Sequence, residues 1–561
     1  MADSWLGSGA STKWWGWGDS GKYFSLHDRP RFVSFLKERL KTSLEQEHRP
    51  VGIEEISLPL PGLPAEVLAR IVSILGETHV STDRAVRVRH AMGKGYRDLV
   101  RVRKGCVASP PDAVLWPGTD KEVEAVLAWA QDHEIAVVPF GGGSSVVGGV
   151  ESQKGAAHRG IVSLDMARMG RVLGIDTFSR TARMQAGITG PALEKALNEK
   201  GYTLGHFPQS FEYSTLGGWV ATRSAGQLSS LYGKIEDMVT SVAMVTPSGR
   251  LETLEIPARA VGPDLTQLVV GSEGTLGVIT DVTVRIHPLP EEKRYMGFFF
   301  KDFISGVEAS RTVVQEGLTP AVLRLSDAEE TQFGLALKPR SAHMGKEAVQ
   351  LGGIWALDKL GYRSERRCLM ILGFEGRKGR ADADAREARK ICKEYGAIFL
   401  GESPGKMWHA ERFEHPYLRD TLLDRAIMID TLETSTDWHN VVPLYLAVSS
   451  ALRDAIRTTG VSEIVMCHLS HVYPTGSSLY FIFLGAQVMG EELEQWYTIK
   501  KAASDCILSH GGTISHHHGV GTDHALWARK EHGPLGIGLL KGLKRSVDPA
   551  GVMNPGKLIM D

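Results

Sequence analysis

Three adjacent histidines toward the C-terminus are the residues with the clearest capacity for chemistry. They occur in the run Ser515-His516-His517-His518-Gly519-Val520-Gly521. Histidine has the side-chain pKa closest to neutrality, so three together can hold and pass protons near pH 7. Neighbouring residues point to different sides of a strand and spread around a helix, so one shared metal ion is not expected. The pattern favours an active site over its two alternatives, a solvated loop and a metal site.

Glycine and hydroxyl residues gather in four stretches that together suit a long, polyhydroxylated cofactor. The first, Pro139-Phe140-Gly141-Gly142-Gly143-Ser144-Ser145, offers consecutive backbone N–H groups without Cβ obstruction, as an anion such as pyrophosphate requires. It matches neither a Rossmann fingerprint nor a P-loop, and alone it is equally compatible with an ordinary glycine-rich turn. The other three stretches span residues 186–190, 214–226 and 271–280.

The elements that must position these residues indicate an α+β protein of several domains, as 561 residues allow. An N-terminal helical extension covers 1–105, with a helix over 31–44. Residues 106–290 form an α+β domain, and residues 291–500 form a second one. Residues 501–561 carry the histidines. The predicted strands are 113–117, 136–140, 160–164, 181–185, 242–246, 277–286, 296–300, 321–325 and 368–374, and the predicted helices are 120–132, 303–316, 381–395 and 535–546.

Composition excludes several classes of function. The net charge is −1, from 64 basic and 65 acidic residues, so broad capture of nucleic acid is not expected. The five cysteines are scattered and never form a C-x-x-C pair, which fits a reducing compartment and gives no zinc knuckle. We see no apolar run of the ~18–20 residues that span a bilayer and no secretory or Ser-Lys-Leu signal, so we expect a soluble, non-secreted protein.

The order of the four loops resembles the FAD-binding domain of vanillyl-alcohol oxidase and p-cresol methylhydroxylase type flavoproteins. Within that superfamily the chain is most similar to the alkyldihydroxyacetonephosphate synthase family, over nearly its whole length. The resemblance implies a two-subdomain FAD-binding domain (106–290), an α+β cap domain with an antiparallel sheet (291–500) and a C-terminal segment (501–561) that returns to the flavin. The motifs that carry it are Lys13-Trp14-Trp15-Gly16-Trp17-Gly18, Gly205-His206, Phe211-Glu212-Tyr213-Ser214-Thr215, Leu325-Ser326-Asp327, Tyr417-Leu418-Arg419-Asp420 and the 515–521 run.

The resemblance also implies which residues contact the FAD. Superfamily members that tether their flavin often have histidine where this chain has Gly143, so FAD is expected to be non-covalent, and no metal is expected. The implied contact residues are Pro139, Phe140, Gly141, Gly142, Gly143, Ser144, Ser145, Gln209, Ser210, Phe211, Glu212, Tyr213, Ser214, Thr215, Thr222, Arg223, Ser224, Ala225, Glu273, Gly274, Thr275, Leu276, Gly277, Val278 and Ile279.

The implied reaction belongs to ether-lipid biosynthesis. The acyl group of acyl-dihydroxyacetone phosphate is exchanged for a long-chain fatty alcohol, which gives the alkyl ether and a fatty acid without net redox change. By matching motif, Tyr480, Arg324, His516, His517 and His518 are expected to be catalytic, and Arg419 is expected to bind substrate. A cationic neighbour would favour the phenolate form of the tyrosine.

Taken without the resemblance, the same residues have plainer interpretations. Tyr480 would be a core-strand tyrosine, and Arg419 would be a surface ion-pair residue. Arg324 lies between apolar neighbours, so it would need an anionic partner if buried.

Two other functions stay open. The main alternative is an FAD-dependent 2-hydroxy-acid (lactate, glycolate or 2-hydroxyglutarate) dehydrogenase or oxidase. The run Asn554-Pro555-Gly556-Lys557-Leu558 resembles the C-terminal sequence of such enzymes. The stretch 467–473 lacks the His-x-Gly-Asp-Gly-x-x-His pattern of many such enzymes. A flavin-binding membrane scaffold without catalysis is the third possibility.

The expected partners are acyl-dihydroxyacetone phosphate, a long-chain fatty alcohol and a second copy of the chain. A membrane could be contacted through residues 344–360, where an ordinary surface helix is the alternative. The expected location is cytoplasmic or membrane-peripheral, and peroxisomal in a eukaryote, although no peroxisomal signal is seen.

Overall fold

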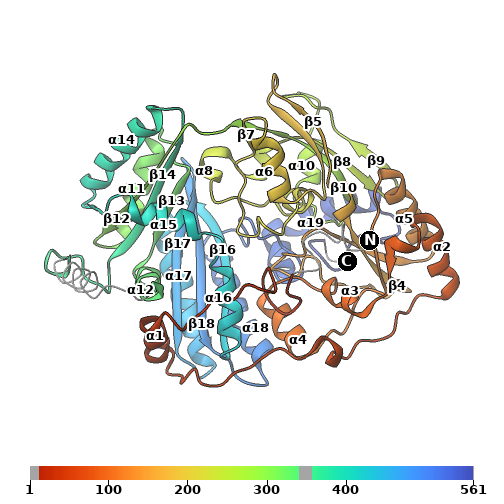
Figure 1. Ribbon diagram of the computed structural model, residues 1–561, viewed down its shortest axis with the longest axis horizontal. Helices are drawn as coiled ribbons and strands as arrows, with labels where there is room; N and C mark the ends of the chain where they lie inside the picture. The colour runs from red at the N-terminus through yellow and green to blue at the C-terminus, as the bar shows by residue number, and fades with distance from the viewer. Residues whose placement is uncertain (1–11, 340–356, 560–561) are drawn as a thin grey trace.

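A computed structural model describes residues 12–339 and 357–559 (Figure 1). Its strands form seven-, five-, four- and two-stranded sheets. The seven-stranded sheet lies on one side of the molecule and the five- and four-stranded sheets lie on the other (Figure 1). The α+β class predicted from the sequence is confirmed.

The four-stranded sheet has the order β1-β2-β4-β3. Three strands run parallel, and β1, from the N-terminal residues, is antiparallel to β2. Helix α5 (Asp120–Asp132) begins at Thr119, whose hydroxyl accepts a hydrogen bond from the Glu122 N–H, and it buries Trp129 beside α2 (Ala65–Leu75). The strands are β1 (Val80–Ser81), β2 (Ala113–Leu115), β3 (Ile135–Phe140) and β4 (Gly160–Asp165).

The five-stranded sheet is antiparallel, with the order β5-β6-β10-β8-β9. Its core also receives α6 (Gly190–Asn198) and α7 (Leu216–Thr222). Together with strands β2, β3 and β4 of the four-stranded sheet it forms the flavin half (residues 106–290). Its strands are β5 (Val172–Asp176), β6 (Thr181–Gln185), β8 (Val239–Thr246), β9 (Gly249–Glu252) and β10 (Val278–Arg285).

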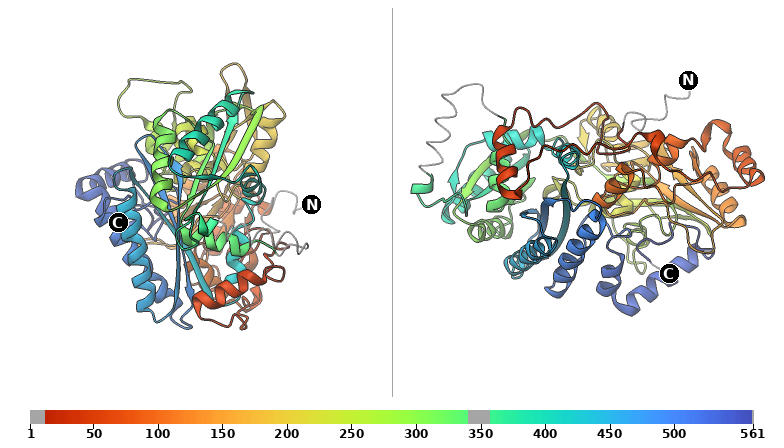
Figure 2. Two further views of the ribbon diagram at one scale, coloured as in Figure 1. Left: turned by 90° about the vertical axis from the view of Figure 1, so that its left-hand side faces the viewer. Right: turned by 90° about the horizontal axis from the view of Figure 1, so that it is seen from below.

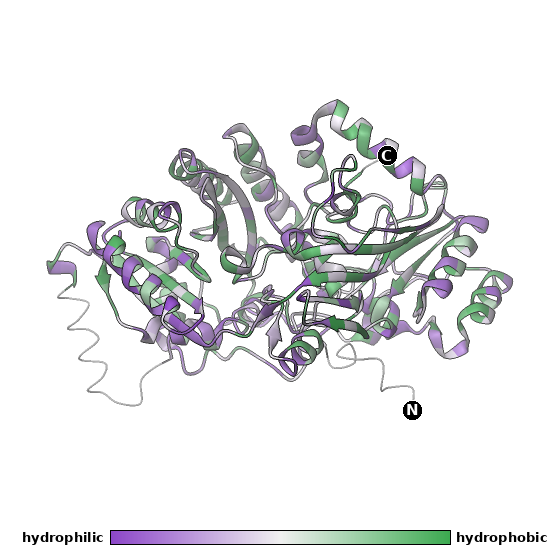
Figure 3. Cartoon of the chain, turned by 90° about the horizontal axis from the view of Figure 1, so that it is seen from above, coloured by the Kyte–Doolittle hydropathy of each residue, from purple (hydrophilic) through white to green (hydrophobic). Residues whose placement is uncertain are grey.

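The seven-stranded sheet is antiparallel throughout, with the order β15-β12-β14-β13-β17-β18-β16. Helices α11 (Phe303–Gln315), α14 (Arg380–Glu394) and α17 (Val441–Thr458) share one large apolar core with it, and α17 packs on α18 (Glu492–Ser509). In Figure 3 purple and green alternate along these helices, as expected of amphipathic helices. The strands are β12 (Glu292–Phe300), β13 (Val322–Ser326), β14 (Cys368–Gly376), β15 (Ile398–Phe399), β16 (Ile427–Asp437), β17 (Glu463–Val472) and β18 (Gly476–Ala486).

The N-terminal residues are built into the large sheet domain. Helix α1 (Pro30–Leu40) packs beside α12 (Ala328–Leu337), as Figure 2 shows for the backbone. Its Phe32 is buried against Phe333. Further upstream, the buried Lys13 ammonium lies 2.9 Å from an Asp420 oxygen on α16 (Pro416–Leu423). In the described part of the chain, no helix is both long and apolar enough to cross a membrane.

The C-terminal residues cross back to the flavin half. Helix α19 (Ala525–Val547) is kinked at Gly533, just before Pro534. Near the end of this helix the buried Lys544 ammonium donates to the Thr275 carbonyl, and beyond the helix Met553 forms a parallel bridge with Val137 in β3. The chain thus returns from the large sheet to β3, the strand in which the Pro139–Ser145 run begins.

Candidate functional site

Three polar side chains lie in one row across the large sheet. Glu433 on β16 is directly opposite Tyr480 on β18, which is directly opposite His468 on β17. Leu479 and Phe481 belong to the core beneath the helices, so alternation along β18 turns Tyr480 to the other face. The sheet therefore presents an acid, a phenol and an imidazole side by side.

The buried Glu433 carboxylate holds the loop that carries the three histidines. It accepts hydrogen bonds from the Ser515 hydroxyl (2.9 Å) and from the backbone N–H groups of His516, His517 (3.0 Å) and His518 (2.8 Å). Burial alone would raise the pKa of Glu433, but backbone N–H donors of the loop, such as that of His517, favour the ionised form and hold the pKa well below its usual value. The ionised acid thus fixes the backbone at all three positions.

The same loop is held at its other end by a carboxylate from the flavin half. Glu273 accepts from the Val520 N–H at 2.6 Å and the Gly521 N–H at 2.7 Å. The histidine loop, residues 515–521, is therefore bonded to both halves of the molecule. The sequence predicted Glu273 as a flavin contact, whereas its side chain is bonded to this loop.

The aromatic rings around Tyr480 form a compact cluster. His468 stacks on it with ring centroids 5.0 Å apart, His517 stacks at 6.0 Å, and His518 meets it edge-on at 5.5 Å. Burial lowers the pKa of His516 to about 3 and also lowers the pKa values of His517 and His518, so these rings are neutral near pH 7 and can accept a proton.

Tyr480 itself is a protonated phenol at rest. Burial raises its pKa to about 12. The nearby Arg324 favours the phenolate, as expected of a cationic neighbour, but desolvation of the charged form outweighs its attraction, so the phenol is protonated in the resting state.

Arg419 on α16 is a half-buried cation with two buried, free hydrogen-bond donors. Its Nε and Nη2 atoms have no hydrogen-bond partner among the described residues, and its guanidinium lies 5.9 Å from the Trp17 ring centroid. The neighbouring acid Asp420 is bonded to Lys13 and to the Trp17 N–H. Buried charges are normally paired, so the position suits a phosphate or carboxylate group. The interpretation as a surface ion-pair residue does not hold.

Arg324 has the anionic partner that burial requires. Its Nη2 lies 2.6 Å from Glu330 Oε1, and its Nη1 lies 3.0 Å from His468 Nε2. The other nitrogen of His468 is 2.9 Å from the same Glu330 oxygen. Arg324 therefore orients His468, which stacks on Tyr480, and it acts on the phenol through this histidine.

The glycine stretches meet as predicted, and close packing explains their composition. A Cβ atom on Gly142 would lie 1.8 Å from the Tyr213 carbonyl oxygen, and one on Gly274 would lie 3.0 Å from Pro139. The backbone N–H groups of Gly142, Gly143 and Ser144 donate to none of the described residues. These free donors beside three other loops fit the pyrophosphate of FAD.

Some predicted flavin contacts have their side chains elsewhere. Phe211, Leu276 and Ile279 pack in the core of the five-stranded sheet, and Val278 packs in the core of the four-stranded one. Arg223 is exposed and bonds Gln267, and Gln209 bonds the Arg412 carbonyl. The loops are brought together, and in β10 (Val278–Arg285) strand alternation turns Val278 and Ile279 to the cores on opposite faces of the sheet.

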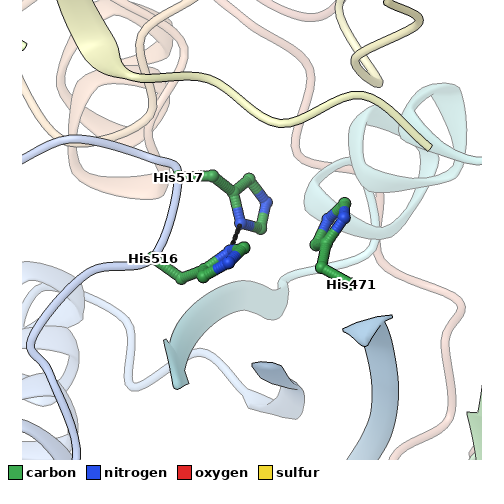
Figure 4. A group of neighbouring side chains, drawn as sticks. All are labelled: His471, His516 and His517. Atoms are coloured by element: carbon green, nitrogen blue, oxygen red, sulfur yellow. Dashed lines mark hydrogen bonds between the residues drawn. The ribbon is translucent and has the colours of Figure 1, made fainter. Parts of the chain in front are cut away.

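Four polar residues near the histidine loop were not predicted as site residues: Glu433, His468, His471 and Tyr473. The His471 Nδ1 lies 2.6 Å from the Ser229 hydroxyl, and the Tyr473 hydroxyl lies 2.7 Å from His516 Nε2. The only signal was the His-x-x-His spacing within residues 467–473. Figure 4 shows that the rings of His471, His516 and His517 face one another. From strand or helix geometry, the adjacent His516 and His517 were expected to point in different directions. The run is a loop, so strand and helix geometry does not apply to it.

A buried histidine in the flavin half makes stability depend on pH. His206 is fully buried with Nε2 2.8 Å from the Ser224 hydroxyl, and burial lowers its pKa to about 3. An unfolded histidine titrates near pH ~6.5, so below that pH the unfolded state binds the proton first. The free energy of unfolding should then fall by up to ~1.4 kcal/mol per pH unit, until about pH 3.

Urea unfolding at pH 7 and pH 5 measures this effect. The variant His206→Gln should lose less stability between the two pH values than the native chain, and the exposed His439→Gln is the control. An equal loss in His206→Gln and the native chain would contradict the assignment.

Two family matches cover most of the chain. Residues 111–255 match a family described as FAD binding domain, and residues 289–558 match the C-terminal domain of FAD linked oxidases. A solved structure of p-cresol methylhydroxylase has the same fold, with a TM-score of 0.67 at 15% identity over 90% of this chain and 99% of its own. The fold, the loops and these matches define an FAD-dependent flavoprotein of that superfamily.

Relatives of higher sequence identity show the family within this superfamily. The alkyldihydroxyacetonephosphate synthase of Trypanosoma brucei brucei is 35% identical over 98% of this chain and 92% of its own length. A solved alkyldihydroxyacetonephosphate synthase superposes with a TM-score of 0.83 at 33% identity and covers 97% of both chains. The chain belongs to the alkyldihydroxyacetonephosphate synthase family.

Proposed function

We propose that this chain replaces the acyl group of acyl-dihydroxyacetone phosphate with a long-chain alcohol, releasing a fatty acid. The observation that carries the proposal is that Arg419, with two buried donors that have no partner among the described residues, lies near Tyr480 and its neutral imidazoles. FAD in the glycine loops would supply an electron-rich carrier for the dihydroxyacetone phosphate unit. The hydroxy-acid alternative is weaker, because residues 467–473 lack the pattern of those enzymes.

Each residue has a role that its surroundings support. Arg419 binds the anionic phosphate or the departing carboxylate. When the ether bond forms, the alcohol loses its hydroxyl proton and the fatty acid leaves as a carboxylate, so one proton passes to the protein in each turnover. Tyr480 relays protons at the reacting carbon, and His517 and His518 accept them. Arg324 positions the phenol through His468.

The assay mixes purified holoprotein with palmitoyl-dihydroxyacetone phosphate and labelled hexadecanol. Labelled ether should form in step with free palmitate. Absence of ether from flavin-loaded protein would overturn the proposal. Rapid bleaching of the flavin by D-lactate or glycolate would instead support the hydroxy-acid alternative.

Changing Arg419 to lysine tests its role in binding. Lysine keeps the charge but loses the planar fork that bonds an anion at two points. We expect KM for the acyl substrate to rise by about 10- to 100-fold, or roughly 1.4–2.8 kcal/mol, with a smaller effect on kcat. Arg425→Lys, beyond the same helix and paired with Glu47, is the matched control. An unchanged KM would show that Arg419 does not contact the substrate.

We also propose peripheral contact with a membrane, because both lipid substrates reside in bilayers. Of the stretch predicted to dock, 344–360, residues up to 356 lie outside the described residues. Flotation with liposomes, with and without residues 344–360, tests the contact, and unchanged flotation would contradict it. A homodimer and a cytoplasmic or membrane-peripheral location, peroxisomal in a eukaryote, stay predictions.

A further inference from the structure

The geometry points to a binding site for a divalent transition metal, with Zn²⁺ as its type, at His471, His516 and His517. Each offers one ring nitrogen, and these nitrogens all lie within 4.8 Å of one another (Figure 4). The Nδ1 atoms of His516 and His517 are 3.0 Å apart. Two ligands of a tetrahedral zinc, each at ~2.0–2.1 Å, lie roughly 3.3 Å apart. The adjacent pair needs almost no movement, and His471 must approach by about an ångström or more.

Two of the three rings are already oriented by their second nitrogens. The Ser229 hydroxyl on α8 (Ser229–Tyr232) lies 2.6 Å from His471 Nδ1, and the Tyr473 hydroxyl lies 2.7 Å from His516 Nε2. Outer hydrogen bonds of this kind fix the orientation of histidine ligands in metal sites. His471 therefore has Nε2 available, and His516 has Nδ1.

The charge around the cluster also suits a cation. The Glu433 carboxylate lies 3.7 Å from His517 Nδ1. The Lys234 ammonium donates to the His516 carbonyl at 2.9 Å, and its charge is paired with Glu236 at 2.9 Å. Three imidazoles favour zinc-type metals over Mg²⁺ or Ca²⁺, which prefer oxygen ligands. With three protein ligands, one coordination position stays open.

Metal at this site inhibits the proposed ether synthesis, and this consequence rests on the proposed function. His517 stacks on Tyr480, and a metal-bound nitrogen has no lone pair left for a proton. The ion also ties the histidine loop to the end of β17, which carries His471. Ether formation should therefore fall as the site fills.

The test is a titration of the purified FAD holoprotein with Co²⁺, which reports imidazole ligation through visible bands at longer wavelength than oxidised flavin. One equivalent should bind and be displaced by Zn²⁺. His471→Asn should weaken Co²⁺ binding by at least roughly 100-fold, and Tyr473→Phe, which removes an outer hydrogen bond, by roughly 10-fold. The control is His510→Asn, an exposed histidine whose Nδ1 is 3.6 Å from Cys506 Sγ and which is the competing surface site.

Every outcome is decisive. Loss of the bands in His471→Asn and weakening in Tyr473→Phe, with an unchanged flavin spectrum and melting temperature, supports the site. Bands that persist in both variants and disappear in His510→Asn overturn it, as does the absence of bands in the native holoprotein. Stoichiometric Zn²⁺ without inhibition overturns the inhibitory role. The spectra are read without substrate, so they stand even if no ether is formed.

Discussion

Replacing Tyr480 with phenylalanine should lower kcat for ether formation by about 10²–10⁴-fold, the range expected for loss of a general acid–base group. The ring and its stacking with His468 and His517 are retained, so only the hydroxyl is lost. Because the phenol is protonated at rest, the variant loses a proton donor and leaves no charge unpaired. FAD binding and the melting temperature should stay unchanged. Turnover of labelled hexadecanol at saturating substrate measures the effect.

The exposed Tyr497→Phe is the matched control and should keep full activity. Activity of Tyr480→Phe within a few-fold of the native chain would contradict the role of the phenol. It would leave the neutral histidines as the proton-transfer groups.

Changing Glu433 to glutamine should damage both stability and activity. The carboxylate accepts four hydrogen bonds from the histidine loop, and an amide turns one acceptor oxygen into a donor that faces these donors. A buried donor without a partner costs about 1–3 kcal/mol, so the free energy of unfolding should fall by roughly 2–4 kcal/mol. A shift of the loop by about an ångström should lower kcat by roughly 100-fold.

Urea unfolding and single-turnover kinetics, measured on the same preparation, test this. Asp437→Asn, an exposed acid at the end of the same strand, should change neither quantity. If Glu433→Gln is as stable as the native chain, the carboxylate does not fix the loop. Loss of stability with full activity would show that the position of the loop does not limit turnover.

Hydrophobic periodicity was enough to predict several of the strands and helices that form the cores. The helix predicted at 120–132 is α5 to the residue, and the strand at 181–185 is β6. The strand β16 was missed because one of its faces carries Glu433 toward the site, which removes the apolar and polar alternation. Strand β17, which pairs with β18, carries an irregularity between Leu469 and Val472, which changes the facing of His471 in a way that spacing does not show.

Only those site residues that belong to a recognisable sequence motif could be predicted. Tyr480 lies beside His517 and His518 of the three histidines, and the half-buried Arg419 lies near it. Glu433 could not be found, because its importance depends on the register that sets it opposite Tyr480 and on a loop more than eighty residues further along the chain. Such register depends on packing of the whole sheet, which is a long-range property.

The return of the chain to β3 has a consequence for the order of assembly during synthesis. Val137 and Glu273 reach their partners Met553, Val520 and Gly521 only long after they leave the ribosome. Until then the edge of β3 and a buried carboxylate lack their bonds, so the flavin half of a nascent chain is unfinished. Stable loading of the flavin should therefore follow synthesis of residue 553, and a ribosome stalled before that point should carry a chain that holds its cofactor poorly.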